Sequence, residues 1–265
     1  MVKIYIDPGH GGNDPGAVGN GLREKDINLT IALRTRDILN AEFEGHDIRM
    51  SRTTDVAKSL SARTNEANRW NADYYLSIHV NAGGGTGFES FIYNGSYQNK
   101  AETNRLRNII HDEVIKRVDF RDRGKKEANF HVLRETRMPA ALTENGFIDH
   151  SSDAQKVRSD QFLTSLARGH AEGLARALNL SRKTSNGTVF YRVVAGSFRL
   201  RENAEQQQRI LRQNGFDSFI HVFHDSHATY YRVIVGSFRN RANAEQRVDE
   251  LSASGFDSFI AVYHA

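Results

Sequence analysis

The stretch VKIYIDPGHGG at residues 2–12 decides how the first part of this chain folds. Its hydrophobic residues Val2, Ile4 and Ile6 are separated by single residues, which is the two-residue period of a β-strand. A glycine-rich loop with His10 follows directly, and the glycines allow a sharp turn that leaves space beside the histidine. Because ligands of α/β proteins gather at the carboxyl ends of strands, this stretch predicts a sheet with a functional loop at its edge.

The first 180 residues continue as alternating strand-like and helix-like segments, the pattern of an α/β domain. We predict a fold of class α/β for residues 1–180, with a mixed sheet flanked by helices. Helices are expected over 24–40, 60–70, 101–118 and 160–178, and further strands over 46–50, 74–80, 88–93, 130–134 and 140–144.

The rest of the chain contains an internal repeat. YRVVAGSF at 191–198 returns forty residues later as YRVIVGSF at 231–238, and each copy reads as strand, helix, strand. A single βαβ unit cannot bury both faces of its elements, so the two copies are expected to share one sheet. This predicts a second, smaller βαββαβ domain at 189–265, joined to the first by a polar linker at 181–188.

The composition limits the kinds of site that the chain can build. With 38% hydrophobic and 26% charged residues, it is typical of a folded globular protein, and it has no apolar run that could span a bilayer, so we expect no membrane insertion. Since the chain has no cysteine, disulfide scaffolds and cysteine-based zinc sites are excluded. Any metal must therefore be held by His, Asp or Glu.

The charge of the chain favours approach to anionic polymers, although an ordinary solvated surface accounts for most of the charged residues. A net charge of +4 and a pI near 9.3 favour anionic polymers such as the bacterial wall, but no block of Lys and Arg supports nucleic-acid binding. Met1 is followed at once by a strand-like segment, so we expect no secretory signal peptide in this chain. Export by another route, or earlier removal of a signal, would then bring the protein to the wall.

Four residues in separate motifs, His10, Glu24, His79 and Glu144, form a candidate metal site. Two histidines and a carboxylate can hold Zn²⁺ with one position open, and a second glutamate can act as general base on water. Each residue alone also has an ordinary explanation: a glutamate in the first turn of a helix, for example, suits the helix dipole. The combination predicts a hydrolase. His131, close in sequence to Glu144, is a further candidate for substrate contact.

Together these motifs resemble those of the zinc-dependent N-acetylmuramoyl-L-alanine amidases of the amidase-3 family. The resemblance covers about residues 2–178, and the motifs occur in the family's order. They are DPGHGG at 7–12, Glu24, SIHVNA at 77–82 and MPAALTENGF at 138–147.

This resemblance implies zinc-dependent hydrolysis of the amide between N-acetylmuramic acid and L-alanine in peptidoglycan. It implies that His10, Glu24 and His79 are the zinc ligands and that Glu144 is the catalytic acid and base. Asn81, Arg52 and Arg63 also lie in family motifs and are expected to be supporting residues.

The repeats resemble the SPOR modules that bind peptidoglycan. The family's motif often has Gln two residues before its glycine, where this chain has Val194 and Ile234. The resemblance suggests four residues as glycan contacts, namely Arg192, Ser197, Arg232 and Ser237. The whole architecture resembles sporulation amidases, which lyse the mother cell, and implies release of the protein from the mother-cell cytoplasm to the wall.

The residues alone are also compatible with three other functions. A phage endolysin would share the chemistry and differ only in biology. Another zinc peptidase, such as a carboxypeptidase, would act on the stem peptide and free a C-terminal residue instead of exposing an N-terminal alanine. A wall-binding protein with a vestigial site would need no intact set of His10, Glu24, His79 and Glu144, so the intact set disfavours it.

Overall fold

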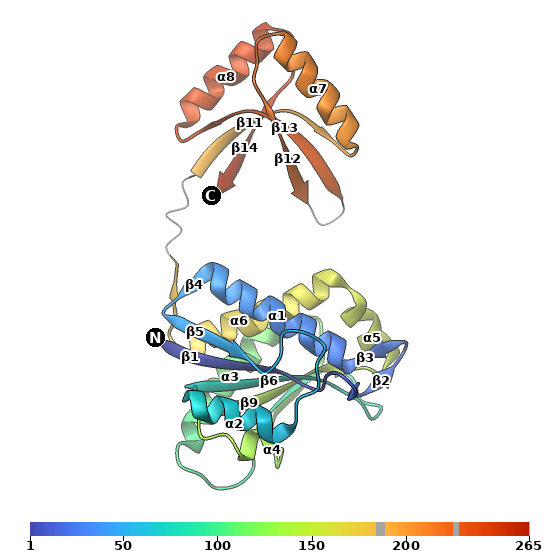
Figure 1. The fold of residues 1–265 in the computed structure, drawn as a ribbon, viewed down its shortest axis with the longest axis vertical. Coiled ribbons are helices and arrows are strands. Elements are labelled where there is room, and N and C mark those ends of the chain that lie inside the picture. Colours follow the sequence, from blue (N-terminus) through green and yellow to red (C-terminus); the bar gives the residue numbers. More distant parts are fainter. Residues whose placement is uncertain (184–188, 225–227, 265) are drawn as a thin grey trace. The chain divides into compact units, whose positions relative to one another are not determined.

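The computed structural model describes residues 1–183, 189–224 and 228–264, and the chain forms two compact units (Figure 1). The first unit spans Met1–Lys183 and the rest of the chain forms the second. Among the described residues, no helix has both the length and the apolar character needed to cross a membrane.

A six-stranded mixed sheet forms the centre of the first unit, as the sequence predicts. Neighbouring strands are parallel except for β7 and β9, which are antiparallel. The carboxyl ends of β1, β6 and β9 therefore lie at the same edge as the first residues of β7 and β8. Across the sheet the order is β5 (His46–Met50), β1 (Val2–Pro8), β6 (Tyr74–Asn81), β9 (Ala140–Phe147), β7 (Phe88–Tyr93) and β8 (Asp122–Ala128).

Helices cover both faces of this sheet, because its strands bury hydrophobic side chains on both sides. Ile4 and Ile6 enter the larger hydrophobic cluster, whereas Tyr5 between them enters the smaller one. The larger cluster contains residues of α1 (Glu24–Glu42), α3 (Lys100–Ile115), α5 (Ser151–Arg158) and α6 (Asp160–Ala177), and the smaller one contains residues of α2 (Leu60–Trp70) and α4 (His131–Arg134).

The strand predicted at 130–134 is wrong, because this segment forms the one-turn helix α4. Val132 and Leu133 are both buried although they are consecutive, which a helical turn permits and a strand with one covered face does not. The sheet instead takes its edge strand β8 from a polar segment that shows no hydrophobic alternation. Charged side chains are common on edge strands, where they oppose pairing with another chain.

The first unit also contains two pairs of two-residue strands. Ser181 and Arg182, which we expected in the linker, form β10 (Ser181–Arg182) and pair with β4 (Phe43–Glu44). Lys183 also lies in the predicted linker and its backbone N–H donates to Glu42 O at 2.8 Å, while residues 184–188 lie outside the described residues. A second short pair, β2 (Val18–Gly19) with β3 (Leu22–Arg23), precedes α1.

In the second unit, the two repeats share one antiparallel sheet, as predicted. Both helices pack on the same side of this sheet, and their contacts centre on small and aliphatic residues such as Ala204, Leu211, Ala244 and Leu251 (Figure 1). The elements are β11 (Val189–Phe198), α7 (Arg201–Gln213), β12 (Phe219–His224), β13 (Thr229–Phe238), α8 (Arg241–Ala253) and β14 (Phe259–His264), and the strand order is β12-β13-β11-β14.

Candidate metal centre

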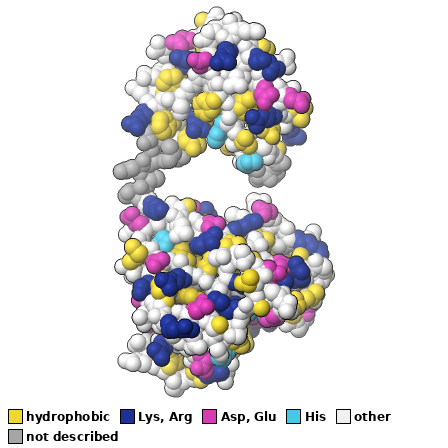
Figure 2. Space-filling view, in the orientation of Figure 1, with side chains coloured by type: hydrophobic (Ala, Val, Ile, Leu, Met, Phe, Trp, Pro, Cys, Tyr) yellow, Lys and Arg dark blue, Asp and Glu magenta, His cyan; other side chains and the backbone are white. Residues whose placement is uncertain are grey.

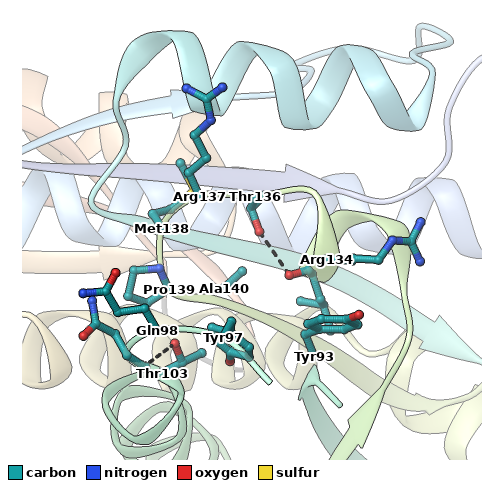
Figure 3. Close-up of a pocket in the computed structure, with 12 residues that line it drawn as sticks. Tyr93, Tyr97, Gln98, Thr103, Arg134, Thr136, Arg137, Met138, Pro139 and Ala140 are labelled. Atoms are coloured by element: carbon teal, nitrogen blue, oxygen red, sulfur yellow. Dashed lines mark hydrogen bonds between the residues drawn. The ribbon is translucent and has the colours of Figure 1, made fainter. Parts of the chain in front are cut away.

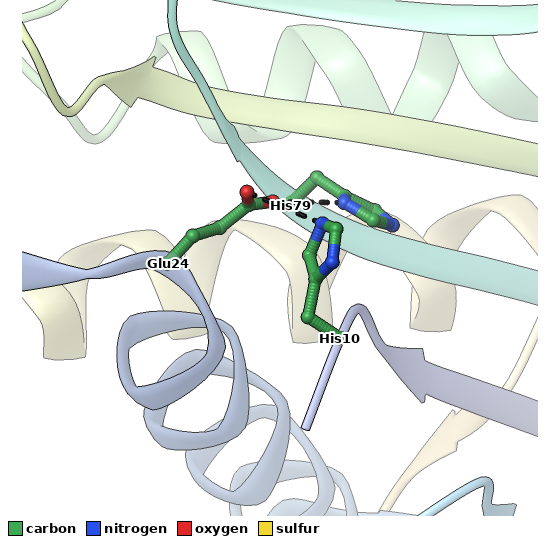
Figure 4. Close-up of side chains that lie close together, drawn as sticks. All are labelled: His10, Glu24 and His79. Carbon is green, nitrogen blue, oxygen red and sulfur yellow. Dashed lines mark hydrogen bonds and ion pairs between the residues drawn. The ribbon is translucent and has the colours of Figure 1, made fainter. Parts of the chain in front are cut away.

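His10, Glu24 and His79 come together at the carboxyl edge of the main sheet (Figure 4). His10 lies in the loop after β1, Glu24 is the first residue of α1, and His79 lies near the end of β6. One ligand atom from each residue can be chosen so that all three lie within 4.8 Å of one another. Two of the contacts are short: His10 Nε2 is 3.2 Å from Glu24 Oε2, and His79 Nδ1 is 2.9 Å from Glu24 Oε1.

Glu24 is buried and its carboxylate is held in place from several sides. Besides the histidines, the backbone N–H groups of Ala17 and Val80 donate to it at 2.8 and 3.2 Å. Burial alone would raise the pKa of Glu24, but the hydrogen bonds and charges of His10 and His79 hold it well below its usual value. Glu24 therefore stays ionised, which is the form that binds a metal.

His10 is oriented by Asp14, a residue that the sequence analysis did not single out. Asp14 Oδ2 lies 2.8 Å from His10 Nδ1, so this carboxylate orients the ring and leaves Nε2 directed at Glu24. Burial lowers the pKa of His10, but Glu24 and Asp14 together raise it above the ordinary value. Metal-binding histidines usually have such a carboxylate partner on their other nitrogen.

The loop that carries His10 depends on glycine where side chains would collide. A Cβ added to Gly9 would lie 2.2 Å from His79 Cε1, and one added to Gly16 would lie 2.5 Å from Glu24 Oε2. Gly16 also has a φ of +65°, in the left-handed region that favours glycine. The two glycines thus leave the space that the side chains of His79 and Glu24 occupy.

Two buried arginines donate hydrogen bonds to the backbone of the same loop. Arg63 donates to the carboxylate of Asp7 at 2.6 Å and to the carbonyl oxygens of Pro8 and His10 at 2.8 and 2.7 Å. Arg52 donates to the carbonyl oxygens of Pro8 and Gly9 at 3.1 and 2.9 Å. Two of the three expected supporting residues, Arg52 and Arg63, therefore donate hydrogen bonds to the backbone beside His10.

Glu144 lies on β9 directly beside His79 of β6 in the parallel register. Its Oε2 atom is buried and has no hydrogen-bond partner among the described residues. Burial raises the pKa of Glu144 well above its usual value, and the negative charges of Glu24 and Glu89 raise it further. A carboxyl group with a raised pKa beside a cluster of ligands is suited to proton transfer.

A cleft of about 400 Å³ joins these groups. It is lined by His10, His79 and Glu144 together with the apolar side chains of Leu60 and Phe130. His131 also lines it, and its Nε2 is buried without a hydrogen-bond partner in the described chain.

Asn81 does not line this cleft, and its amide donates to Glu89 at 2.8 Å instead. A second cavity of about 220 Å³ is lined by residues such as Tyr93, Tyr97 and Met138 and includes none of the four candidate site residues (Figure 3). The proposed chemistry therefore belongs to the first cleft.

In the second unit, the four predicted glycan contacts lie on the sheet face opposite the helices. Arg192 pairs with Ser237 and Ser197 pairs with Arg232 across β11 and β13, so each serine shares a face with an arginine. This face is not covered by α7 or α8, since the residues that pack on those helices alternate with it. In the space-filling view, basic, hydrophobic and histidine side chains lie next to one another where the strands form the surface (Figure 2).

Both arginines of this face stack on aromatic rings. The Arg192 guanidinium lies 3.3 Å from the ring centre of Tyr263, and that of Arg232 lies 3.4 Å from the ring centre of Phe223. Val194 and Ile234 occupy the position where the SPOR motif often has Gln. They are register partners of each other on β11 and β13, and both are buried.

A helix-flanked α/β sheet that brings His10, Glu24, His79 and Glu144 together at one edge has the side chains expected of a hydrolase. Comparison with known proteins then gives its family. The family model of N-acetylmuramoyl-L-alanine amidases matches residues 4–176, and the model of the SPOR domain matches residues 171–262. The chain belongs to the N-acetylmuramoyl-L-alanine amidase family.

Individual relatives are similar in sequence to this chain over most of its length. N-acetylmuramoyl-L-alanine amidase CwlM of Bacillus licheniformis is 54% identical over 85% of this chain and 87% of its own length. The sporulation-specific N-acetylmuramoyl-L-alanine amidase of Bacillus subtilis is 56% identical over 83% of this chain and 84% of its own. The crystal structure of N-acetylmuramoyl-L-alanine amidase from Clostridium difficile is 36% identical, with a TM-score of 0.63, over 67% of this chain and 97% of that one.

The predicted activity is thereby confirmed: the protein is an amidase that cleaves peptidoglycan and carries a peptidoglycan-binding SPOR domain. This decides against the carboxypeptidase and against a wall-binding protein without activity.

Proposed function

We propose that the amidase is a zinc enzyme whose ion is held by His10, Glu24 and His79. Two imidazole nitrogens and one carboxylate are a known donor set of catalytic zinc, and the chain offers no thiolate as an alternative. The Asp14 carboxylate behind His10 supports this assignment. When bound, zinc supplies a Lewis acid that polarises the amide carbonyl and lowers the pKa of water.

Glu144 acts as the general base and then as the general acid. It takes a proton from the attacking water and passes it to the nitrogen of L-alanine as the amide bond breaks, so that the products are the muramic carboxylate and a free amine. Its position beside His79 supports this role. Although burial favours its protonated form, a cation in the neighbouring cluster favours the ionised form that the first proton transfer needs.

The observation that carries this proposal is the convergence of His10, Glu24 and His79 next to the cleft that Glu144 lines. The test is digestion of purified peptidoglycan by the full chain, with new N-terminal alanine measured by mass spectrometry. EDTA should abolish release and Zn²⁺ should restore it, and His79→Ala should lose both the activity and the bound zinc. An enzyme that keeps full activity after exhaustive chelation would refute the zinc assignment.

The side chains around the cleft have proposed roles as well. His131 contacts the substrate, since it lines the cleft with a nitrogen that lacks a protein partner. Arg52 and Arg63 position the loop of His10, and Asn81 positions Glu89. His131→Gln should therefore change KM more than it changes zinc content, whereas Arg63 variants should change both.

The second unit holds the enzyme on glycan strands through Arg192, Ser197, Arg232 and Ser237. Stacked arginines with hydroxyl groups beside them offer apolar surface and hydrogen-bond donors together, which suits sugar rings. In a pull-down with insoluble peptidoglycan, the double variant Arg192→Ala/Arg232→Ala should stay in the supernatant. Arg209→Ala on the helical face is the matched control and should bind like the wild type.

The biological setting that we propose is lysis of the mother cell during sporulation, after release of the protein from the mother-cell cytoplasm. The support is the sporulation-specific amidase of Bacillus subtilis, to which the chain is 56% identical. A deletion strain should form spores but retain mother-cell walls, as seen by microscopy. Expression restricted to a phage lytic cycle would instead favour the endolysin alternative.

A further inference from the structure

A second charged cluster lies beside the catalytic base, and the amidase reaction itself leaves it without a role. Glu89 on β7 pairs with Glu144 on β9 in the antiparallel register, so the two side chains share one face of the sheet. Glu89 is buried and its Oε2 binds two cations from β8, Arg123 at 2.8 Å and Lys126. One carboxylate with two cations leaves this cluster with a positive charge.

Arg123 is held rigidly but keeps hydrogen-bond donors without partners. Its Nε donates to Glu89, and its guanidinium lies 4.7 Å from the ring centre of Phe147. Its two terminal nitrogens donate to nothing in the described part of the chain, and 27% of the side chain is exposed. An ordered guanidinium with free N–H groups matches the geometry of a carboxylate.

The buried arginines of the first unit differ from Arg123 in this respect. All three nitrogens of Arg52, of Arg63 and of Arg107 donate to protein oxygens. Their roles are structural. Of these four arginines, Arg123 alone has a positioned guanidinium whose terminal N–H groups can still bind a ligand. It lies at the same edge of the sheet as the catalytic cleft.

We propose that Arg123, assisted by Lys126, binds a free carboxylate on the second residue of the stem peptide and thereby selects acidic over amidated peptides. This inference rests on the proposed function, because it needs the scissile amide at Glu144. Two residues of extended peptide span about 7 Å. Adjacent strands are separated by about 5 Å, and Glu89 on β7 is the register partner of Glu144. Because the Arg123 side chain reaches back from β8 to Glu89, its guanidinium lies within the span of these two residues.

The test compares two disaccharide-peptide substrates that differ only in the second residue, a γ-linked glutamate with a free α-carboxylate or its carboxamide. Wild-type enzyme should show kcat/KM about tenfold higher for the acid, mainly through KM. Arg123→Gln should lower kcat/KM for the acid about tenfold and leave the carboxamide substrate unchanged, so that the preference disappears. Lys126→Gln should have a smaller effect in the same direction.

Arg121→Gln is the matched control. It removes the same charge two residues earlier, from an exposed side chain with no hydrogen-bond or ion-pair partner in the described chain. It should keep the wild-type preference, which would separate direct contact from the general field of the protein. Activity of Arg123→Gln on the carboxamide also serves as the control for folding.

Several outcomes would overturn the proposal. Equal kcat/KM of the wild-type enzyme for acid and carboxamide, or equal losses of Arg123→Gln on both, would exclude selection by this residue. If the effect of Arg123→Gln on whole walls disappears when phosphate polymers are stripped by acid, the ligand is a phosphate and the carboxylate assignment is wrong. Full activity of Glu144→Gln on both substrates would instead refute the proposed function.

Discussion

Glu144 and His79 are register partners on adjacent parallel strands, so the proposed base and a proposed metal ligand are fixed relative to each other by the sheet. Neither side chain depends on a loop for its position. His10, in contrast, is carried by a loop whose shape is maintained by Arg52, Arg63 and two glycines. The sheet therefore fixes His79 and Glu144, whereas the position of His10 depends on the hydrogen bonds of its loop.

Glu144→Gln should reduce kcat by at least about a hundredfold, because the amide keeps the shape of the side chain but cannot accept the proton of water. Zinc content should be unchanged, since Glu144 is not among the three converging ligands. Alanine release and bound zinc measured on the same sample check this. The control is Glu127→Gln, an exposed residue of β8. Activity above a few per cent in Glu144→Gln would remove Glu144 as the base.

Asp14→Asn should weaken zinc binding about tenfold while leaving the fold intact. The charge of Asp14 favours the ring orientation and basicity of His10, and loss of such partners commonly costs ten- to a hundredfold in affinity. Competition with a chromogenic chelator measures the affinity. Asp37→Asn, an exposed residue of α1, is the control and should bind zinc like the wild type. Equal affinity in both variants would mean that Asp14 has no part in holding the metal.

Arg63→Met should destabilise the first unit by about 3–5 kcal/mol, because it leaves the buried carboxylate of Asp7 without its cation. Urea unfolding followed by the fluorescence of Trp70, the single tryptophan, reports on this unit alone. Breaking the exposed pair of Arg23 and Asp26 should cost at most about 1 kcal/mol. Adding Asp7→Asn to Arg63→Met should recover part of the loss.

Stability of the first unit should fall as the pH drops from about 6.5 to 4, because His170 is buried. Its Nε2 lies 3.0 Å from Thr143 Oγ1, and burial lowers its pKa from 6.5 to about 4. Below pH 6.5 the unfolded chain binds this proton and the folded chain does not, so protonation favours unfolding until both states are protonated below pH 4. The difference amounts to about 3 kcal/mol.

His170→Gln should flatten this part of the pH profile, whereas His150→Gln, at a partly exposed position, should not. Urea midpoints read from Trp70 fluorescence at several pH values measure the slope. Identical slopes for His170→Gln and the wild type would show that other groups cause the acid sensitivity.

The sequence predicted the elements with strong hydrophobic periodicity. The strand at 88–93 has its predicted bounds, and its hydrophobic side chains are buried. The helix at 60–70 also has its predicted bounds, although it buries Arg63, Thr64 and Ala67 rather than a hydrophobic stripe. The segment of β8 was missed because its neighbour β7 fixes it through backbone hydrogen bonds, while its own side chains are polar. α4 was missed because a single turn is too short to show a helical period.

The candidate site could be assembled from the sequence as far as its motifs reach. His10, Glu24, His79 and Glu144 each lie in a motif, and the structure brings them together. Asp14 had a local signal, an acidic residue four positions after a histidine in a glycine-rich loop. The cluster of Arg123 with Glu89 had none, because it depends on the pairing of β7 with β8.

The exchange of partners between the repeats, Arg192 with Ser237 and Ser197 with Arg232, gives the open sheet of the second unit an approximate twofold axis. A linear polymer lying across that axis meets nearly the same side chains whichever of its ends comes first. The main exception is the place where His221 of one repeat corresponds to Ala261 of the other. Such a module can hold a chain without reading its polarity, so the direction of cleavage along the polymer is left to the catalytic unit.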